Sequence, residues 1–508
     1  MPDRTEHINL PAMLNPAFHK GETWGFPGAS VDHIETHAAH VFLVGDRAFK
    51  LKKPVKLPYL DFSTLEKRRE VLHREFEINR RFTPDIYIGI IEKEGEPVLV
   101  MNRFAGSAIL SGRLAQGGID DALARSLADM AAAAHGAAPV AETRGSDIMA
   151  GLGAQLSSAF TASADLFQAA ETLEFHAHYE EALHRLKPLL NRRSSTGLVR
   201  RCHGDMHCNN IVVIAGKPTL FDAIEFSDKI ATIDVLYDLA FLIMDLLRHG
   251  QTRPANIVFN SYLNLRRAGE DLSGLAALPL FLATRAGVRA LVTADLVHEL
   301  PIDRSLKQRG DALDYFRASV SYLKPMPPRV VCIGGLSGTG KSTLGARLAP
   351  TIGCAPGAVH VRSDVERKVR AGVPETQRLS AGHYTQAASS DVYEAMFGRA
   401  RVALAAGHSV ILDAVFARES ERRMAEDIAA RLGVSFRGIW LEAAPGILKS
   451  RAATRLGDAS DATPDVVETQ LRYDVGSIAW DRVDASGSVE AAEAAIKQKL
   501  LYRSAVRA

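Results

Sequence analysis

One stretch in the middle of the chain has residue types and spacing suited to phosphoryl transfer. RCHGDMHCNNIVV, residues 201–213, places Asn210 five residues after Asp205 and directly before an apolar run. This order predicts a loop that leads into a strand and holds a carboxylate near an amide. A second carboxylate, Asp222, follows a short hairpin through AGK. A base beside two oxygen ligands for Mg²⁺ suits phosphoryl transfer, because the metal stabilises charge on the phosphoryl oxygens.

A second stretch, GLSGTGKS, fits the pattern G-x-x-x-x-G-K-[ST] and follows the apolar run RVVCIG. Together they predict a strand, a phosphate-binding loop and a helix. In that arrangement backbone N–H groups point at a β-phosphate, Lys341 reaches the β- and γ-phosphates, and Ser342 coordinates Mg²⁺. The predicted nucleotide-binding residues here are Gly335, Leu336, Ser337, Gly338, Thr339, Gly340, Lys341, Ser342 and Thr343.

Polar residues also follow three further predicted strands in the C-terminal half. Asp364 follows VHVRS, Asp413 ends HSVILD, and two arginines, Arg451 and Arg455, come after RGIWLE. Because the carboxyl ends of parallel strands meet at one crevice, we expect these side chains to line the phosphate site. The arginines lie one helical turn apart, a spacing suited to a clamp on the transferring phosphoryl group.

The elements that position these residues fall into three predicted domains. Residues 1–104 predict a small β-rich lobe, and residues 105–324 predict a larger helical lobe that carries the loop at Asp205. Prolines at 325, 327 and 328 forbid a continuing helix, so we place a boundary near Lys324. In residues 325–508, strand-like runs at 329–334, 358–362, 408–412 and 436–441 alternate with helical stretches, which is typical of a doubly wound parallel sheet.

Two local signals define the small lobe in more detail. HVFLVGDRAFKLKKPV predicts two strands that turn at Gly45-Asp46, and EPVLVMNRF predicts another strand. Ser63 and Glu66 have capping-box spacing and predict the start of a helix that ends near Phe82.

Charge and composition narrow the class of protein. The 508 residues contain 61 Lys and Arg against 59 Asp and Glu, a formal net charge of +2. This balance does not favour nucleic acid or an anionic membrane as a partner. The N-terminus lacks a signal-peptide pattern, and the four cysteines include no C-x-x-C pair, so we expect a soluble cytoplasmic protein with reduced thiols.

The motifs HGDMHCNN, FDAIEF and YDLAFL together resemble the aminoglycoside phosphotransferase and choline-kinase-like family, over roughly residues 30 to 320. The resemblance implies a protein-kinase-like bilobal fold. It implies Asp205 as catalytic base, Asn210 and Asp222 as Mg²⁺ ligands, and His203 as an organiser of the loop. Asp238 in YDLA is implied as a structural residue at the start of a helix.

The small lobe offers candidates for nucleotide binding. Lys50 lies late in a strand, as does the kinase lysine that pairs with the α- and β-phosphates, and Lys52 lies on the same face. We favour Lys50. Glu75 on the following helix is our candidate partner, with Glu70 as the alternative. Met101 to Arg103 are expected to present backbone groups to adenine. No G-x-G-x-x-G precedes Lys50, and ETHAAHVF occupies that place.

The C-terminal half, over about 329 to 500, resembles small P-loop kinases such as gluconate kinase, chloramphenicol phosphotransferase, polynucleotide 5′-kinase and zeta toxin. The resemblance implies that Asp364 positions or deprotonates the acceptor hydroxyl and that Arg451 and Arg455 are lid arginines. Asp413 stands where a Walker-B-like metal carboxylate is expected.

The sequence therefore predicts a bifunctional phosphotransferase that uses ATP and Mg²⁺ at two sites, with hydroxyls of small molecules as acceptors. One alternative is a single catalytic module regulated by ATP binding in the other. Another is a nucleic-acid or toxin-like P-loop kinase, which the near-neutral charge does not favour. Residue patterns of this kind identify neither the acceptor nor the oligomeric state.

Overall fold

The computed structural model describes residues 14–36, 38–57, 60–267, 270–295, 302–454 and 459–502. Two compact units divide the chain: the first is formed by residues 1–148 and 191–249, the second by 149–190 and 250–508. The helices between 250 and 324 thus share a unit with the P-loop region. The compact units do not divide near Lys324, so the predicted domain boundary there stays a prediction.

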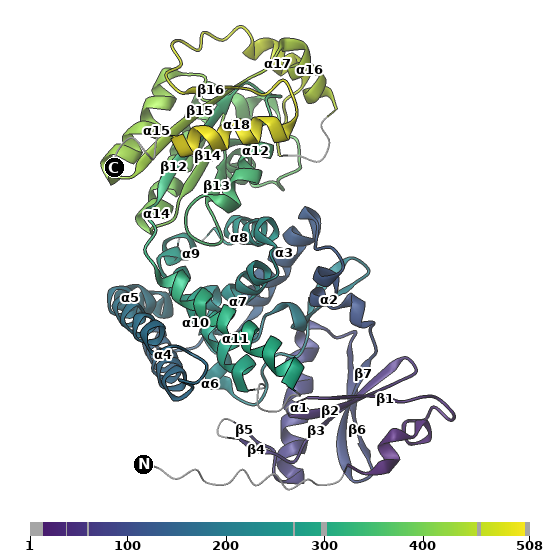
Figure 1. The fold of residues 1–508 in the computed structure, drawn as a ribbon. Helices are drawn as coiled ribbons and strands as arrows, with labels where there is room; N and C mark the ends of the chain where they lie inside the picture. Colours follow the sequence, from purple (N-terminus) through teal and green to yellow (C-terminus); the bar gives the residue numbers. More distant parts are fainter. Residues whose placement is uncertain are drawn as a thin grey trace. The chain divides into compact units, whose positions relative to one another are not determined.

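An antiparallel sheet and one long helix form the small lobe of the first unit (Figure 1). The sheet has the order β1-β2-β3-β7-β6. Its strands are β1 (Asp32–Glu35), β2 (Ala39–Val44), β3 (Arg47–Lys52), β6 (Tyr87–Lys93) and β7 (Glu96–Asn102). The expected turn at Gly45-Asp46 joins β2 to β3, and Gly45 has a φ of 56°, which glycine tolerates.

Helix α1 (Leu65–Phe82) packs its buried Leu72 against Tyr87 and Leu99 of the sheet. Its end agrees with the expectation, but its N-cap does not. Thr64, whose side chain accepts from the Lys67 N–H, caps the helix in place of Ser63. The Ser63 hydroxyl instead donates to Asp61 at 2.6 Å, so it is already used in the preceding turn.

Short strands and helices position the loop at Asp205 in the same unit. Hairpin β9–β10 follows this loop, and strand β11 pairs with β8 before helix α7 begins. The elements are β4 (Lys56–Leu57), β5 (Leu60–Asp61), α2 (Leu110–Ala115), α3 (Asp121–Ala137), β8 (Val199–Arg201), β9 (Ile211–Ile214), β10 (Lys217–Leu220), α6 (Asp228–Ala231), β11 (Thr232–Asp234) and α7 (Val235–Arg248).

The second unit includes an all-helical part. Its elements are α4 (Gly145–Ala162), α5 (Ala169–Ser195), α8 (Thr252–Leu265), α9 (Glu270–Ser273), α10 (Leu278–Asp295) and α11 (Ile302–Leu323), of which α4 and α5 each extend a few residues into the first unit. By length and composition, the described stretch Glu270–Asp295 is apolar enough to cross a membrane, and 67% of its most apolar window is buried inside the fold.

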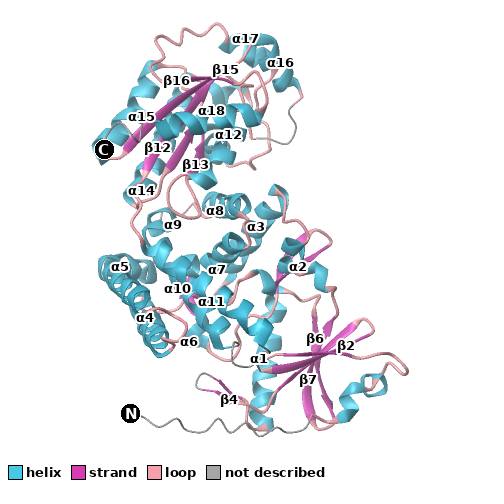
Figure 2. Cartoon of the chain, viewed as in Figure 1, coloured by secondary structure: helices cyan, strands magenta, loops and turns pink. Residues whose placement is uncertain are grey.

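A five-stranded parallel sheet with the order β13-β14-β12-β15-β16 forms the rest of the second unit (Figure 2). Helices α12 and α18 pack on one face, and α14 and α15 pack on the other. The elements are β12 (Arg329–Gly335), α12 (Lys341–Leu348), β13 (Val359–Arg362), α13 (Ser363–Arg370), α14 (Gln386–Ala405), β14 (Val410–Asp413), α15 (Glu419–Leu432), β15 (Ser435–Glu442), α16 (Pro445–Ala453), α17 (Pro464–Gln470), β16 (Asp481–Asp484) and α18 (Val489–Tyr502).

Four of these strands agree with the predicted runs, whereas β16 was not predicted. Its sequence, DRVD, has a single apolar residue, Val483, which enters the core beside Leu441 and Ile496. A strand this short and charged carries too little periodicity to be recognised before its neighbours are known.

A buried ion pair holds the start of α7. Arg193 is fully buried, and its Nε and Nη2 atoms lie 2.6 and 2.8 Å from the two carboxylate oxygens of Asp234. Asp234 also accepts the Leu236 N–H at 2.8 Å and so caps the helix.

We expect Asp234→Ala to lower the free energy of unfolding by about 3–5 kcal/mol, because it leaves a buried guanidinium without its carboxylate. Asp228→Ala is the matched control: this aspartate pairs with Arg201 at 2.8 Å, but its side chain is 64% exposed. We expect a loss of at most about 1 kcal/mol there. Urea unfolding followed by circular dichroism measures both, and equal losses would contradict the assignment.

Candidate active sites

The loop at Asp205 joins its carboxylate directly to an amide. Asn210 Nδ2 donates to Asp205 Oδ2 at 2.8 Å and to the Asp205 carbonyl at 3.0 Å. This geometry leaves the amide oxygen of Asn210 to face another ligand. His207 Nε2 lies 3.3 Å from the same Asp205 oxygen. The pair expected from the spacing is therefore brought together in the structure.

Backbone contacts around His203 hold this loop in place. His203 contacts the Phe221 carbonyl through Nε2 at 3.0 Å and accepts the Asp205 N–H at 3.3 Å through Nδ1. Burial lowers the pKa of His203, so the ring favours the neutral form that can accept this bond. Asp238, fully buried in the first turn of α7, accepts the Gly204 N–H at 3.1 Å. Gly204 has a φ of 87°, and a Cβ there would meet Ile224 at 3.0 Å.

Both candidate lysines of β3 face one buried carboxylate. Lys50 Nζ lies 2.7 Å from Glu75 Oε1, and Lys52 Nζ lies 2.7 Å from Glu75 Oε2. Lys50 also lies 2.7 Å from Asp222 Oδ1, which links the small lobe to the carboxylate that follows β10. Glu70, the alternative partner, is exposed. The two lysines therefore differ in their second partner, not in their access to Glu75.

A residue that the sequence analysis did not assign completes this group. Glu225 Oε1 lies 2.6 Å from Lys52 Nζ, and both side chains are buried. It stands in the quoted motif FDAIEF, three residues after Asp222, and that second carboxylate was the available signal. We call Lys50, Lys52, Glu75, Asp222 and Glu225 the lysine–carboxylate cluster.

Burial and charge oppose each other in this cluster. Burial by itself would lower the pKa of Lys50, but the charges of Asp222 and Glu75 raise it well above its usual value. Burial would raise the pKa of Glu75, but Lys50 and Lys52 lower it. The pKa of Glu225 is raised by burial against the opposing effect of Lys52. Lys50 and Glu75 are thus held in their charged forms.

Asp222 has features suited to a metal ligand. It adopts a left-handed φ of 59°, and its N–H donates to the Tyr87 hydroxyl at 3.0 Å. Lys50 contacts Oδ1, so Oδ2 remains for another ligand, and 43% of the side chain is exposed. A strained backbone at a partly open carboxylate is a feature found at functional sites. Asn210 and Asp222 therefore fit Mg²⁺ by chemistry, since both offer oxygen.

Residues 101–103, which we expect to present backbone groups to adenine, lie at and directly after the end of β7. Met101 lies within β7, opposite Ala48 of β3. The N–H of Arg103 already donates to the Asp46 carbonyl at 2.9 Å, and its guanidinium contacts Asp32. The Arg103 N–H is therefore used by the β2–β3 turn, and the adenine contact of residues 101–103 stays a prediction.

In the second unit, the GLSGTGKS loop lines a cavity of about 960 Å³. Gly338 has a φ of 87°, and a Cβ there would lie 2.5 Å from the Leu448 carbonyl, so only glycine fits. The Ser337 N–H donates to Gln470 at 2.8 Å, and Lys341 Nζ donates to the carbonyls of Gly335 and Leu336. The loop residues at the cavity wall are Ser337, Gly338, Gly340, Lys341, Ser342 and Thr343.

Asp364 and Asp413 line the same cavity, and their environments separate their acidities. Burial raises the pKa of Asp364. Burial would also raise the pKa of Asp413, but His360, with Nε2 3.3 Å away, and the charge of Arg362 lower it to about 2. Asp413 Oδ2 is buried without a hydrogen-bond partner among the described residues. An ionised carboxylate in the wall of a cavity that Ser342 also lines fits a Mg²⁺ site by donor chemistry.

The expected arginine clamp is not formed as predicted. Arg451 donates to the carbonyls of Ala485 and Gly487 in the loop after β16, and it does not line the cavity. Helix α16 directs the Arg451 side chain toward these carbonyls and not into the cavity, so the structure does not support its expected role as a lid arginine. Arg455 lies outside the described residues. The arginines that line the cavity instead are Arg362, Arg367 and Arg418. Nothing in VHVRS distinguished Arg362 from a solvent-exposed residue.

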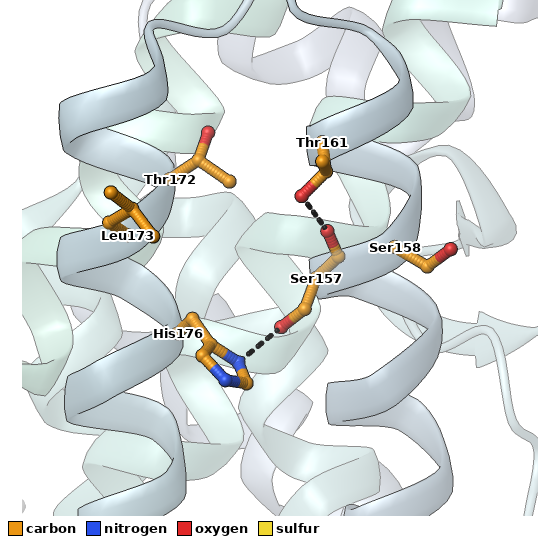
Figure 3. A pocket seen from close by; sticks show the side chains of 6 residues that line it. All are labelled: Ser157, Ser158, Thr161, Thr172, Leu173 and His176. Carbon is orange, nitrogen blue, oxygen red and sulfur yellow. Dashed lines mark hydrogen bonds between the residues drawn. The ribbon is translucent and has the colours of Figure 1, made fainter.

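A small hollow between α4 and α5 offers no comparable chemistry. Its volume is about 310 Å³, and Figure 3 shows His176 turned toward Ser157, with 3.2 Å between Nδ1 and Oγ. The residues that line it are Ser157, Ser158, Thr161, Thr172, Leu173 and His176. None of these six carries a carboxylate, an ammonium or a guanidinium group, so they provide no phosphate-binding set.

Two family models match parts of the chain that contain most of the candidate site residues. A model described as the phosphotransferase enzyme family matches residues 67–277, and one described as an AAA domain matches residues 330–474. Uncharacterized proteins of Mycobacterium tuberculosis and Mycobacterium bovis are 30% identical over 489 residues, which cover 91% of this chain and 93% of each relative. The chain belongs to this two-domain phosphotransferase family. It is a kinase-type enzyme, and the expected kinase-like fold followed by a P-loop sheet is confirmed.

Solved structures also resemble each half of this kinase. The GDP complex of aminoglycoside 2′-phosphotransferase-IIIa is 16% identical and covers 57% of this chain and 92% of its own, with a TM-score of 0.38. A choline/ethanolamine kinase family protein from Mesorhizobium loti is 12% identical, with 58% and 92% covered and a TM-score of 0.37. A gluconokinase from Sinorhizobium meliloti 1021 is 21% identical, with 36% and 99% covered and a TM-score of 0.25.

The opposite pKa shifts of Asp364 and Asp413 can be tested directly. On lowering the pH from about 7 to about 4, we expect Asp364 to gain a proton first, because burial raises its pKa above 3.8, while Asp413 stays ionised with a pKa of about 2. Carboxyl ¹³C shifts of labelled aspartates measure this, with Asp364→Asn and Asp413→Asn as assignment controls. Protonation in the reverse order would contradict the arrangement.

Proposed function

We propose that this kinase transfers the γ-phosphoryl group of ATP to hydroxyls of small molecules at two Mg²⁺-dependent sites. The observation that carries the proposal is that each unit holds its own complete set of a lysine, a candidate base and candidate metal ligands. The first set is Lys50, Asp205, Asn210 and Asp222, and the second is Lys341, Asp364, Ser342 and Asp413.

In the N-terminal site, Lys50 binds the α- and β-phosphates and is oriented by Glu75 at 2.7 Å. Asp205 accepts the proton of the acceptor hydroxyl, whose oxygen then bonds to the γ-phosphorus as the bond to the β–γ bridging oxygen breaks and ADP leaves. Asn210 and Asp222 would hold Mg²⁺, which neutralises charge on the phosphates when bound. Asn210 also orients Asp205 through the 2.8 Å bond.

In the C-terminal site, the loop N–H groups and Lys341 bind the β- and γ-phosphates of ATP. Ser342 and Asp413 would hold Mg²⁺. Asp364 positions the acceptor hydroxyl and takes its proton, a role supported by its place in the cavity and its raised pKa. Arg362 at the cavity wall supplies positive charge for the transferring group in place of the expected pair of arginines.

Two alternatives make different predictions. A regulatory relation between the sites is favoured by one observation: helices from 250–324 belong to the same compact unit as the P-loop sheet. A nucleic-acid acceptor is not favoured by the net charge of +2. The cytoplasmic location and the acceptor of each site remain predictions.

We expect Asp205→Asn to lower N-terminal turnover by about 10²-fold or more, because the amide cannot accept the proton, while ATP affinity changes less than about threefold. The assay is ADP release by the full chain with a panel of small hydroxyl compounds, in a Lys341→Ala background that silences the second site. Asp129→Asn, an exposed aspartate on α3, is the matched control. Unchanged turnover in Asp205→Asn would refute the base assignment.

Lys341→Ala tests the second site and its independence from the first. Loss of the ammonium at the phosphates should cost about 10²-fold or more in C-terminal turnover. If the sites only share a chain, N-terminal turnover should change less than about threefold, which is about 0.65 kcal/mol. Steady-state kinetics of the full chain measure both activities, with Lys449→Ala on α16, 43% exposed, as the control. A larger N-terminal change would favour the regulatory alternative.

A further inference from the structure

Strand β13 lies at the edge of the parallel sheet, next to β14, so one side of its backbone has no strand partner. Helix α8 covers that side through Asn260. Its Oδ1 accepts the His360 N–H at 2.8 Å, and its Nδ2 donates to the Ala358 carbonyl at 3.2 Å. One asparagine side chain thus satisfies a donor and an acceptor that a neighbouring strand would otherwise satisfy.

Asn256, one turn earlier on α8, supports this contact. It is 3% exposed, and its Nδ2 donates to the carbonyls of Pro356 and Ala358 at 3.1 and 3.2 Å. Its own Oδ1 accepts from Asn260 Nδ2 at 3.0 Å. The spacing of four residues places both asparagines on one face of the helix. Their mutual bond restricts the rotamer of Asn260.

The residue that Asn260 holds also contacts the candidate metal carboxylate. His360 receives the Asn260 contact on its backbone, and its side-chain Nε2 lies 3.3 Å from Asp413 Oδ2. Asp413 is 3% exposed. His360 is one of two β13 side chains at this carboxylate; the other is Arg362, whose Nε lies 3.7 Å from the same oxygen. A displacement of β13 at His360 is transmitted to Asp413 through the closer of the two contacts.

A second tether joins the same helical region to the helix that carries Asp364. Glu366 on α13 is buried, and its two oxygens contact Arg267 Nη1 at 2.8 Å and Arg399 Nε at 3.2 Å. Arg267 follows the end of α8, whereas Arg399 belongs to α14. Asn260 thus contacts the strand before Asp364, and Arg267 contacts the helix that contains Asp364. Both residues precede the P-loop sheet in the chain.

We propose that helix α8 positions the P-loop site and that Asn260 is a positioning residue for phosphoryl transfer there, acting through His360 on Asp413. This inference rests on the proposed function of that site. Without Asn260, the edge strand is released and Asp413 loses its fixed orientation. The phosphate-binding loop follows β12, a central strand, so nucleotide binding is less affected than metal binding.

The test compares Asn260→Leu with its parent in the full chain, both carrying Asp205→Asn to silence the first site. In the ligand-free protein, we expect amide hydrogen exchange at His360 to accelerate by about tenfold or more, because the bond from its N–H is lost. With Mg²⁺ and ATP alone, where water is the phosphoryl acceptor and ADP and phosphate are the products, ATP hydrolysis should fall by about tenfold, since small misplacements at a reacting centre are costly. The Mg²⁺ concentration for half-maximal turnover should rise about fivefold, with the KM for ATP within about twofold.

Asn264→Leu is the matched control, since Asn264 lies one turn later on α8 and accepts from Arg399 at 3.3 Å, not from β13. It should leave His360 exchange unchanged. Any effect on the Mg²⁺ dependence would report the second tether, because Arg399 also contacts Glu366. His360→Leu combined with Asn260→Leu should cost little more than His360→Leu alone, because both act along one path.

Unchanged exchange at His360, or unchanged turnover and Mg²⁺ dependence in Asn260→Leu, overturns the proposal. If Asn260→Leu does not fold, Asn260→Ser, which loses the same bonds without a bulky apolar side chain, replaces it. If neither variant folds, Asn260 serves folding and the proposal is overturned. A parent without Lys341-dependent ATP turnover would instead refute the proposed function of this site.

Discussion

The N-terminal site depends on the mutual neutralisation of buried charges in the lysine–carboxylate cluster. Glu75 is fully buried between two ammonium groups at 2.7 Å, and removal of either would leave charge uncompensated at high cost. The members come from β3, α1 and the segment after β10, so the site forms only when these elements meet. Asn79 also joins α1 to the segment after β10: its amide donates to the Glu75 carbonyl at 3.1 Å and accepts the Ala223 N–H at 2.7 Å. The pairing that orients Lys50 in the proposed site thus also stabilises the fold.

The P-loop site depends on the backbone conformation of its loop and on two carboxylates of different acidity. In the proposed site the backbone N–H groups of the loop bind phosphate, so the conformation of the loop is decisive. Gly338 is required for that conformation, because a Cβ there would lie 2.5 Å from the Leu448 carbonyl. The two carboxylates share one cavity but are held at different acidities, because His360 and Arg362 act on Asp413 while burial dominates at Asp364. A separation of this kind lets one carboxylate stay a metal ligand while the other exchanges a proton.

The outcome for individual residues shows where sequence reasoning was sufficient. Asp205 and Asn210 are five residues apart in one loop, and a loop that short keeps them together. Lys50 and Glu75 belong to the same lobe and lie only 25 positions apart, with the short strands β4 and β5 between β3 and α1. The prediction for Arg451 was wrong because the spacing of residues within a helix does not determine which way the helix faces. Its guanidinium donates to the Ala485 carbonyl. Glu225 was missed because a carboxylate near a motif acquires meaning only when Lys52 is beside it.

The sequence by itself determined the two motif loops, the identity of their charged residues and the alternation of strands and helices around the P-loop. These depend on short-range spacing and on backbone conformations that only particular residues adopt. Tertiary structure alone decided that the two lysines of β3 share Glu75 and that Lys52 also contacts Glu225. It also decided that Arg362 lines the cavity and that α8 covers the edge of the P-loop sheet through Asn260. Those relations join residues from about 25 to more than 170 positions apart. They follow from how the faces of distant elements pack, which local spacing does not encode.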